Sequence, residues 1–166
     1  YQIKEISDEH QISEVCSKAA KTVLYIPFAY ISEREALIAN KLQYLTDDFL
    51  CLRLDLMSGI RMPNTFSGVC NGTVGLTELL DLAQRDSIEK EDILDYCAPD
   101  NKGYITPGKP KHSDDVFDYD LDTIKKLIRT ASELNEDDSY PMNVLIVAEG
   151  FRIADYIEIA SLVDEI

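Results

Sequence analysis

Three charged residues lie in or directly after short apolar stretches, and their side chains are of types that bind phosphate or metal ions. Arg34 comes soon after the apolar run Val23–Ile26, Asp55 lies within Phe49–Met57, and Glu149 follows Val144–Ala148. An arginine can hold a phosphate through paired hydrogen bonds, and two carboxylates can ligate magnesium. Open α/β sheets bind ligands at the carboxyl ends of their strands. We therefore treat Arg34, Asp55 and Glu149 as candidate nucleotide-binding residues that share one edge of a sheet.

Each of these residues also has a simpler interpretation. Arg34 can be a solvated helix residue paired with a neighbouring glutamate. Asp55 can cap the loop that follows its strand. Glu149 can be a solvated loop acid, as most exposed carboxylates are. The residue types alone leave both interpretations open.

The segment between the first strand and the following helix reads FAYISERE, residues 28–35. Nucleotide-binding domains carry G-x-x-x-x-G-K-[ST] in a turn of this kind, because glycine lets the backbone approach the phosphates closely. The segment contains no glycine, lysine or threonine. Glu33 and Glu35 place negative charge where phosphate would bind. The sequence therefore predicts that ATP with magnesium is not bound as it is by a working phosphate loop.

The same segment offers apolar and aromatic side chains of the kind that are enriched at protein interfaces. These interface candidates are Phe28, Tyr30 and Ile31. Alternatively, Phe28 and Ile31 fill the vacated phosphate cavity as local core. Both interpretations predict that the segment no longer serves nucleotide binding.

The elements that must position these residues alternate along the chain. Besides the three apolar strands, residues 102–108 predict a brief strand that Pro107 and Gly108 stop. Predicted helices cover Ser32 to about Leu45, with Ser32 as N-cap, then a short stretch from Gly75, then Ile88–Tyr96, Leu121–Leu134 and Ile153–Val163. Residues 60–74 and 109–119 read as loops. Strands that are apolar at nearly every position, separated by helices, predict a three-layer α/β fold with a mainly parallel sheet covered on both faces.

The composition of the chain limits the classes of partner that it could bind and indicates a compartment. The 166 residues carry a formal net charge of −15, which repels phosphates, so we expect no nucleic-acid binding. No apolar run has transmembrane length, so we expect no direct membrane insertion. The four cysteines show no C-x-x-C spacing, which gives no indication of a metal site and suits a reducing, cytoplasmic compartment. We expect residues 1–21 to be a linker or the end of an upstream domain and residues 22–166 to form the α/β domain.

The order of these pieces resembles the MinD/ParA superfamily of P-loop ATPases, which open with a strand, GKGGVGKT and a helix. The chain aligns with that opening without a gap. Arg34 falls on the P-loop lysine, Ala29 on the signature lysine and Glu35 on the magnesium-binding threonine, with glycines replaced by Phe28, Tyr30, Ile31 and Glu33. Asp55 falls on the second aspartate of the family's VLLVDLD strand, and Arg53 replaces the first. GLTELL at residues 75–80 and YITPG at 104–108 resemble two further family segments.

Within this superfamily the chain is most similar to the TadZ/CpaE pilus-localisation proteins, whose P-loop is often degenerate. The resemblance implies the N-terminal two-thirds of a P-loop NTPase-like domain that is incomplete at its C-terminus. It also implies a pseudo-ATPase with no cofactor and no catalytic residue. Such a domain would form homodimers and contact protein partners that position or assemble a cell-envelope machine such as a pilus. Its place would be the cytoplasm, with partners holding it at the inner face of the membrane. The alternative is an active ATPase that binds ATP and magnesium through a rearranged site.

Overall fold

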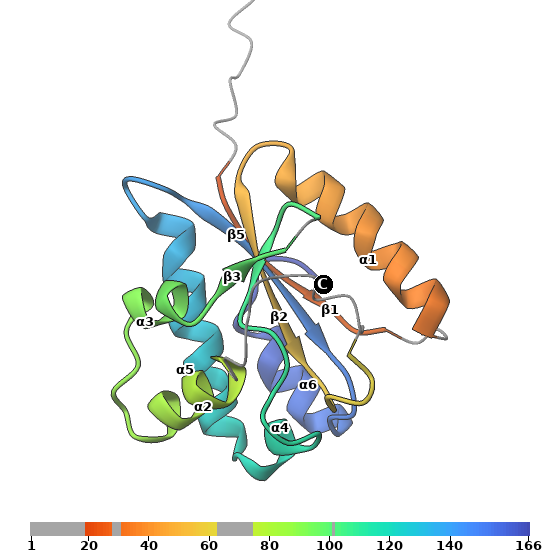
Figure 1. The fold of residues 1–166 in the computed structure, drawn as a ribbon, viewed down its shortest axis with the longest axis vertical. Coiled ribbons are helices and arrows are strands. Elements are labelled where there is room, and N and C mark those ends of the chain that lie inside the picture. Colours follow the sequence, from red (N-terminus) through yellow and green to blue (C-terminus); the bar gives the residue numbers. More distant parts are fainter. Residues whose placement is uncertain (1–18, 28–30, 63–74, 101) are drawn as a thin grey trace, which may run out of the picture.

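The computed structural model describes residues 19–27, 31–62, 75–100 and 102–166, with the side chains of residues 31 and 32 left undescribed. Within them, one five-stranded sheet has the order β1-β5-β2-β4-β3 (Figure 1). The strands are β1 (Thr22–Tyr25), β2 (Leu50–Leu56), β3 (Ala98–Pro99), β4 (Ile105–Thr106) and β5 (Met142–Ala148). All neighbouring strands are parallel except β3 and β4, which pair antiparallel. The prediction of an α/β fold with a mainly parallel sheet is confirmed.

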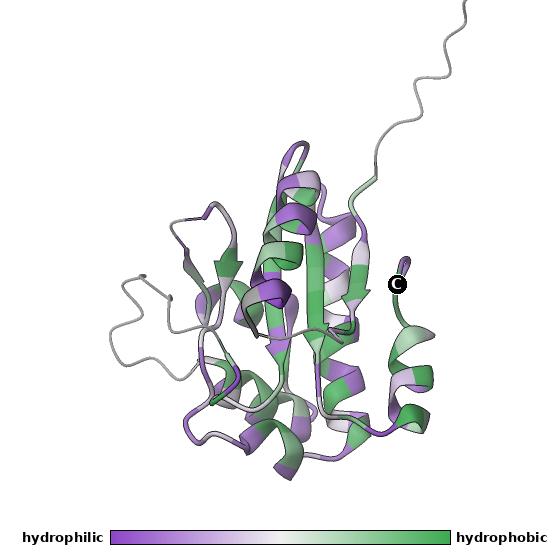
Figure 2. Ribbon diagram, turned by 90° about the vertical axis from the view of Figure 1, so that its right-hand side faces the viewer, coloured by the Kyte–Doolittle hydropathy of each residue, from purple (hydrophilic) through white to green (hydrophobic). Residues whose placement is uncertain are grey.

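The central strand β5 explains why the sequence shows unbroken apolar runs. All seven of its residues are buried, because β1 and β2 flank it and helices cover both of its faces. Figure 2 shows hydrophobic residues concentrated along these strands. In the parallel register Leu54 lies beside Ile146 and Asp55 beside Val147, so alternate residues of β2 and β5 face opposite layers.

Six α-helices and a short 3-10 helix belong to the described part of the chain. They are α1 (Ile31–Thr46), α2 (Gly75–Gln84), α3 (Lys90–Asp95), α4 (Asp115–Asp118), α5 (Leu121–Ser132), η1 (Glu133–Glu136) and α6 (Ile153–Ala160). Helix α1 packs on the face that carries Arg53 and Asn143; the Asn143 side-chain amide donates to the Leu45 carbonyl. Helix α5 lies on the opposite face of the sheet, where the Thr22 hydroxyl donates to Ser132 Oγ (Figure 1). An ion pair between Lys125 of α5 and Glu158 of α6 connects these two helices.

The strands of the sheet and the helices that cover it meet in a buried core. Leu24, Leu42, Leu52, Leu54, Ile124, Leu127, Val144 and Ile146 are almost inaccessible to solvent, whereas Ile26 and Ile105 are only partly buried. Three local expectations are wrong. Helix α1 already begins at Ile31, so Ser32 is inside it and is not its N-cap; the loop predicted for 109–119 contains α4; and β3 was not foreseen. Residues 1–18, which make up most of the expected linker or upstream segment, lie outside the described residues.

Candidate functional site

The buried side of α1 begins with a charged residue. Ile38, Leu42 and Leu45 are buried, and Arg34 stands one helical turn before them on the same face with no exposed area. An arginine at this position enters the space between α1 and the carboxyl ends of the strands. The interpretation of Arg34 as a solvated helix residue is therefore wrong. The signal that could have revealed it is the four-residue spacing from Arg34 to Ile38 and Leu42.

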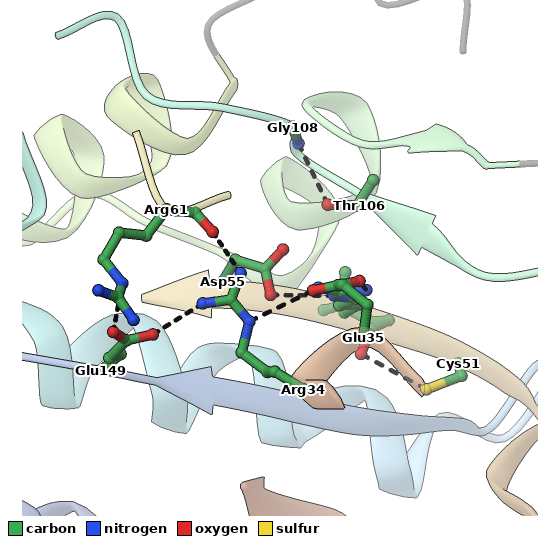
Figure 3. A network of polar contacts seen from close by, with 10 residues as sticks. Arg34, Glu35, Cys51, Asp55, Arg61, Thr106, Gly108 and Glu149 are labelled. Atoms are coloured by element: carbon green, nitrogen blue, oxygen red, sulfur yellow. Dashed lines mark hydrogen bonds and ion pairs between the residues drawn. The ribbon is translucent and has the colours of Figure 1, made fainter. Parts of the chain in front are cut away.

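Arg34 is held by groups that come from distant parts of the sequence (Figure 3). Its Nη1 donates to Glu149 Oε2 over 2.8 Å, and its Nη2 donates to the backbone carbonyl of Arg61. The Arg61 guanidinium in turn pairs through Nε with Glu149 Oε1. Each oxygen of the Glu149 carboxylate therefore faces a different arginine. Arg34 is fully buried, the Glu149 side chain is 18% exposed and the Arg61 side chain is 46% exposed.

Glu149 is placed by the end of β5. Its backbone N–H donates to the Leu56 carbonyl over 3.0 Å, which extends the ladder between β2 and β5 by one residue. Gly150 follows with φ 91°, and a Cβ there would come within 2.9 Å of the Phe117 ring. The turn after β5 therefore needs glycine. Glu149 continues the alternation of Leu145 and Val147, the β5 residues on the face covered by α1, and so points toward α1.

A second set of ion pairs lies beside the first, on β2. Arg53 Nε donates to Asp55 Oδ1 over 2.9 Å, and both of its terminal nitrogens lie 3.4 Å from the Glu35 carboxylate of α1. Arg53 also stands over the Tyr104 ring, with 5.5 Å from its Cζ to the ring centroid. Burial raises the pKa of Tyr104 to about 12, so its hydroxyl stays neutral. Arg53 is thus enclosed by two carboxylates and an aromatic face.

Burial is the main influence on Asp55. The carboxyl is almost inaccessible, and loss of hydration raises its pKa despite the opposing effect of the Arg53 guanidinium. Its other oxygen, Oδ2, is buried and has no hydrogen-bond partner among the described residues. Asp55 therefore binds Arg53 within the sheet and does not face solvent, whereas residues 63–74, which form most of the loop that it was expected to cap, lie outside the described residues.

The two sets form one connected group, which we call the arginine cluster. It contains three guanidinium groups and three carboxylates, from Arg34, Arg53, Arg61, Glu35, Asp55 and Glu149. The sets are linked by Glu35, whose Oε1 lies 3.4 Å from Arg34 Nε as well as from Arg53. Buried charges are tolerated when they are paired and hydrogen-bonded in this way.

The structure thus brings the three candidate residues together at one edge of the sheet, where they pair with one another or with neighbouring side chains. Arg34 and Glu149 bind each other, and Asp55 binds Arg53. Arg53, Arg61 and Glu35 complete the cluster and were not among the candidates. A charged residue inside an apolar strand, as Arg53 is, was the available signal. Within the described ranges no three His, Cys, Asp or Glu side chains converge as metal ligands would.

The interface candidates cannot be placed. Phe28 and Tyr30 lie outside the described residues, and Ile31 is described only as the first residue of α1.

Neither the comparison with protein-family models nor the comparison with curated proteins finds a match to this chain. Among the helices that the structure describes, none combines the length and the apolar character needed to span a bilayer.

Proposed function

We propose that this chain is a non-catalytic domain of the MinD/ParA type, in which the nucleotide site has been replaced by the arginine cluster and which acts through protein–protein contacts. The carrying observation is that Arg34, at the position of the P-loop lysine in the sequence alignment, is fully buried and bound by Glu149. An arginine engaged in this way does not offer its guanidinium to a phosphate unless that pair is broken first.

The remaining charges support the same conclusion. Asp55 would have to ligate magnesium in the alternative of an active ATPase, yet Arg53 occupies one of its oxygens and burial favours its neutral form. Glu35 and Glu149 also bring negative charge close to where a triphosphate would lie. Repulsion between a phosphate and such carboxylates in a partly dry site costs on the order of several kcal/mol.

Titration calorimetry of the unmodified chain with ATP and magnesium tests the loss of nucleotide binding. We expect no heat of binding at micromolar ATP. Micromolar affinity would contradict the proposal and favour the active ATPase with a rearranged site. ADP with magnesium should give the same result as ATP, because the cluster excludes the phosphates common to both.

The protein-contact part of the proposal concerns homodimers or partner subunits in the cytoplasm, with positioning of a cell-envelope machine such as a pilus as the role that the resemblance supports. Sedimentation velocity with and without ATP should show the same assembly state. Tyr30→Ala with Ile31→Ser should weaken assembly, whereas Tyr140→Ala with Leu94→Ser, which alters exposed residues elsewhere, should not. A folded Tyr30/Ile31 variant with unchanged assembly and partner binding would leave the cavity-filling interpretation.

A further inference from the structure

The Glu149 carboxylate is bound as an external anion would be. Its two oxygens are held by two different arginines, Arg34 through Nη1 and Arg61 through Nε. Arginine pairs of this kind recognise the oxygens of carboxylates and phosphates by the same charge-assisted hydrogen bonds. The site also lies in the first turn of α1, where backbone N–H groups favour negative charge.

We propose that Arg34 and Arg61 form a latent oxyanion site which the protein's own Glu149 occupies, and that a phosphate group is the external ligand able to replace it. This inference deepens the proposed function and rests on it, because it identifies the group that keeps phosphate out of the unmodified domain.

Arg34 is held for this role independently of Glu149. Its Nη2 donates to the Arg61 backbone carbonyl, so one edge of the guanidinium is fixed while Nη1 faces the anion. Its Nε is buried without a hydrogen-bond partner among the described residues, although Glu35 lies 3.4 Å away. A fully buried guanidinium with some of its N–H groups unbonded is unstable without a nearby anion. It should therefore bind an external anion when its carboxylate partner is removed.

Access to the site comes from the Arg61 side. Arg61 is nearly half exposed and Glu149 is partly exposed, whereas Arg34 lies behind them. Glu149 also stands at the start of the turn made by Gly150, outside the body of β5. A small oxyanion could therefore enter beside Arg61 once the carboxylate is absent, without any opening of the sheet.

A variant series with inorganic phosphate tests the inference. We compare the unmodified chain with Glu149→Ala and Glu149→Gln, by thermal unfolding and calorimetry in phosphate and in sodium chloride of equal ionic strength. Glu165→Ala is the matched control, because Glu165 also bridges two cations, Lys21 and Lys41, but at an exposed position. Only the Glu149 variants should gain saturable phosphate binding, about tenfold tighter than in the unmodified chain or more.

A second substitution locates the gained site. Adding Arg61→Gln to Glu149→Ala should abolish the gain, since Arg61 would hold one side of the phosphate. A folded Glu149→Ala variant whose response to phosphate equals that of Glu165→Ala would overturn the inference. If both Glu149 variants unfold in chloride, refolding in phosphate supports the inference, and failure to refold in phosphate overturns it. ATP binding by the unmodified chain would contradict the proposed function instead, and it leaves the comparison with phosphate alone unaffected.

Discussion

Glu149 and Glu165 each bridge two cations, and they differ in almost every other respect. Glu149 joins Arg34 and Arg61 at the carboxyl edge of the sheet, where Arg34 is fully buried. Glu165 joins Lys21 and Lys41 beside the edge strand β1, and all three side chains are between one quarter and two fifths exposed. Glu149 and Glu165 therefore make the same number of ion pairs but differ in how far their partners are removed from solvent. Water can replace the partners of Glu165, whereas it does not reach the fully buried Arg34 to replace Glu149 there.

The choice of cation follows the same division. Lysine ammonium groups are compact and strongly hydrated, which suits the half-exposed pairs around Glu165. The guanidinium of Arg34 presents several N–H groups in fixed directions and so binds Glu149 and a backbone carbonyl at once. The comparison teaches that the buried bridge carries structural and recognition roles, while the exposed bridge adds little to stability.

The sharpest way to break the comparison is Arg34→Met, which keeps an unbranched side chain as far as the position of Nε and removes the charged end of the guanidinium. Glu149 is then left partly buried and short of a partner, so we expect a loss of about 3–5 kcal/mol in the free energy of unfolding. Lys41→Met is the matched change at the exposed bridge and should cost about 0–1 kcal/mol. Urea unfolding of both variants checks the difference, and equal losses would show that burial does not separate the two bridges.

A smaller effect should come from exchanging the two cation types. Arg34→Lys retains the charge but cannot donate to Glu149 and to the Arg61 carbonyl together, so we expect a loss of about 1–3 kcal/mol. Lys41→Arg should change stability by no more than about 0.5 kcal/mol. Thermal unfolding monitored by circular dichroism measures both. A neutral Arg34→Lys variant would mean that the carbonyl contact is dispensable.

The sequence predicted the sheet and its main helices because burial on both faces leaves runs such as 144–148 that are apolar throughout. It could not reveal the arginine cluster. Arg34 and Glu149 are 115 residues apart, and each is of a type that is usually exposed. The elements that were missed, β3 and α4, have two and four residues, too few for a hydrophobic period to show. The local hydrophobic pattern thus predicted the strands and the main helices. The charge pairs could not be predicted in this way, because they depend on contacts between segments that are distant in the sequence.

Stability should depend on pH with opposite signs in the buried arginine cluster and at the exposed Glu165 bridge. Asp55 is the group that titrates in the buried cluster. Burial raises its pKa in the folded state, so the folded state holds the Asp55 proton more tightly than the unfolded chain does. Its contribution to stability is therefore present at low pH and is lost as the pH rises through the folded-state pKa. Relative to Asp55→Asn, the unmodified chain should lose stability as the pH rises over the range that begins at 3.8, the ordinary pKa of an aspartate. Urea unfolding across this range measures the difference, and a gain with rising pH would contradict it.

The smallest effect is expected at Glu165, with the reverse sign. Hydrogen bonds from Lys21 and Lys41 lower the pKa of Glu165 in the folded state. Its contribution is present above the unfolded-state pKa and disappears as the pH falls through the folded-state value. Glu165→Gln should cost about 0–1 kcal/mol at neutral pH, because the site is well solvated. The gap between variant and unmodified chain should close on acidification below 4.5, the ordinary pKa of a glutamate. A gap that widens on acidification would count against this account.

The position of β5 between β1 and β2 has a consequence for how the chain is synthesised. β1 and β2 do not pair with each other. β1 must wait for β5, which begins at Met142, and before β5 emerges β2 has only the two-residue strand β4 as a neighbour. A nascent chain that has left the ribosome only as far as α5 therefore carries two apolar strands with nothing between them. Non-local strand pairing of this kind delays folding, and hydrophobic surface stays exposed until the pairing is complete. The domain should consequently engage chaperones during translation and release them only after Ala148 has emerged.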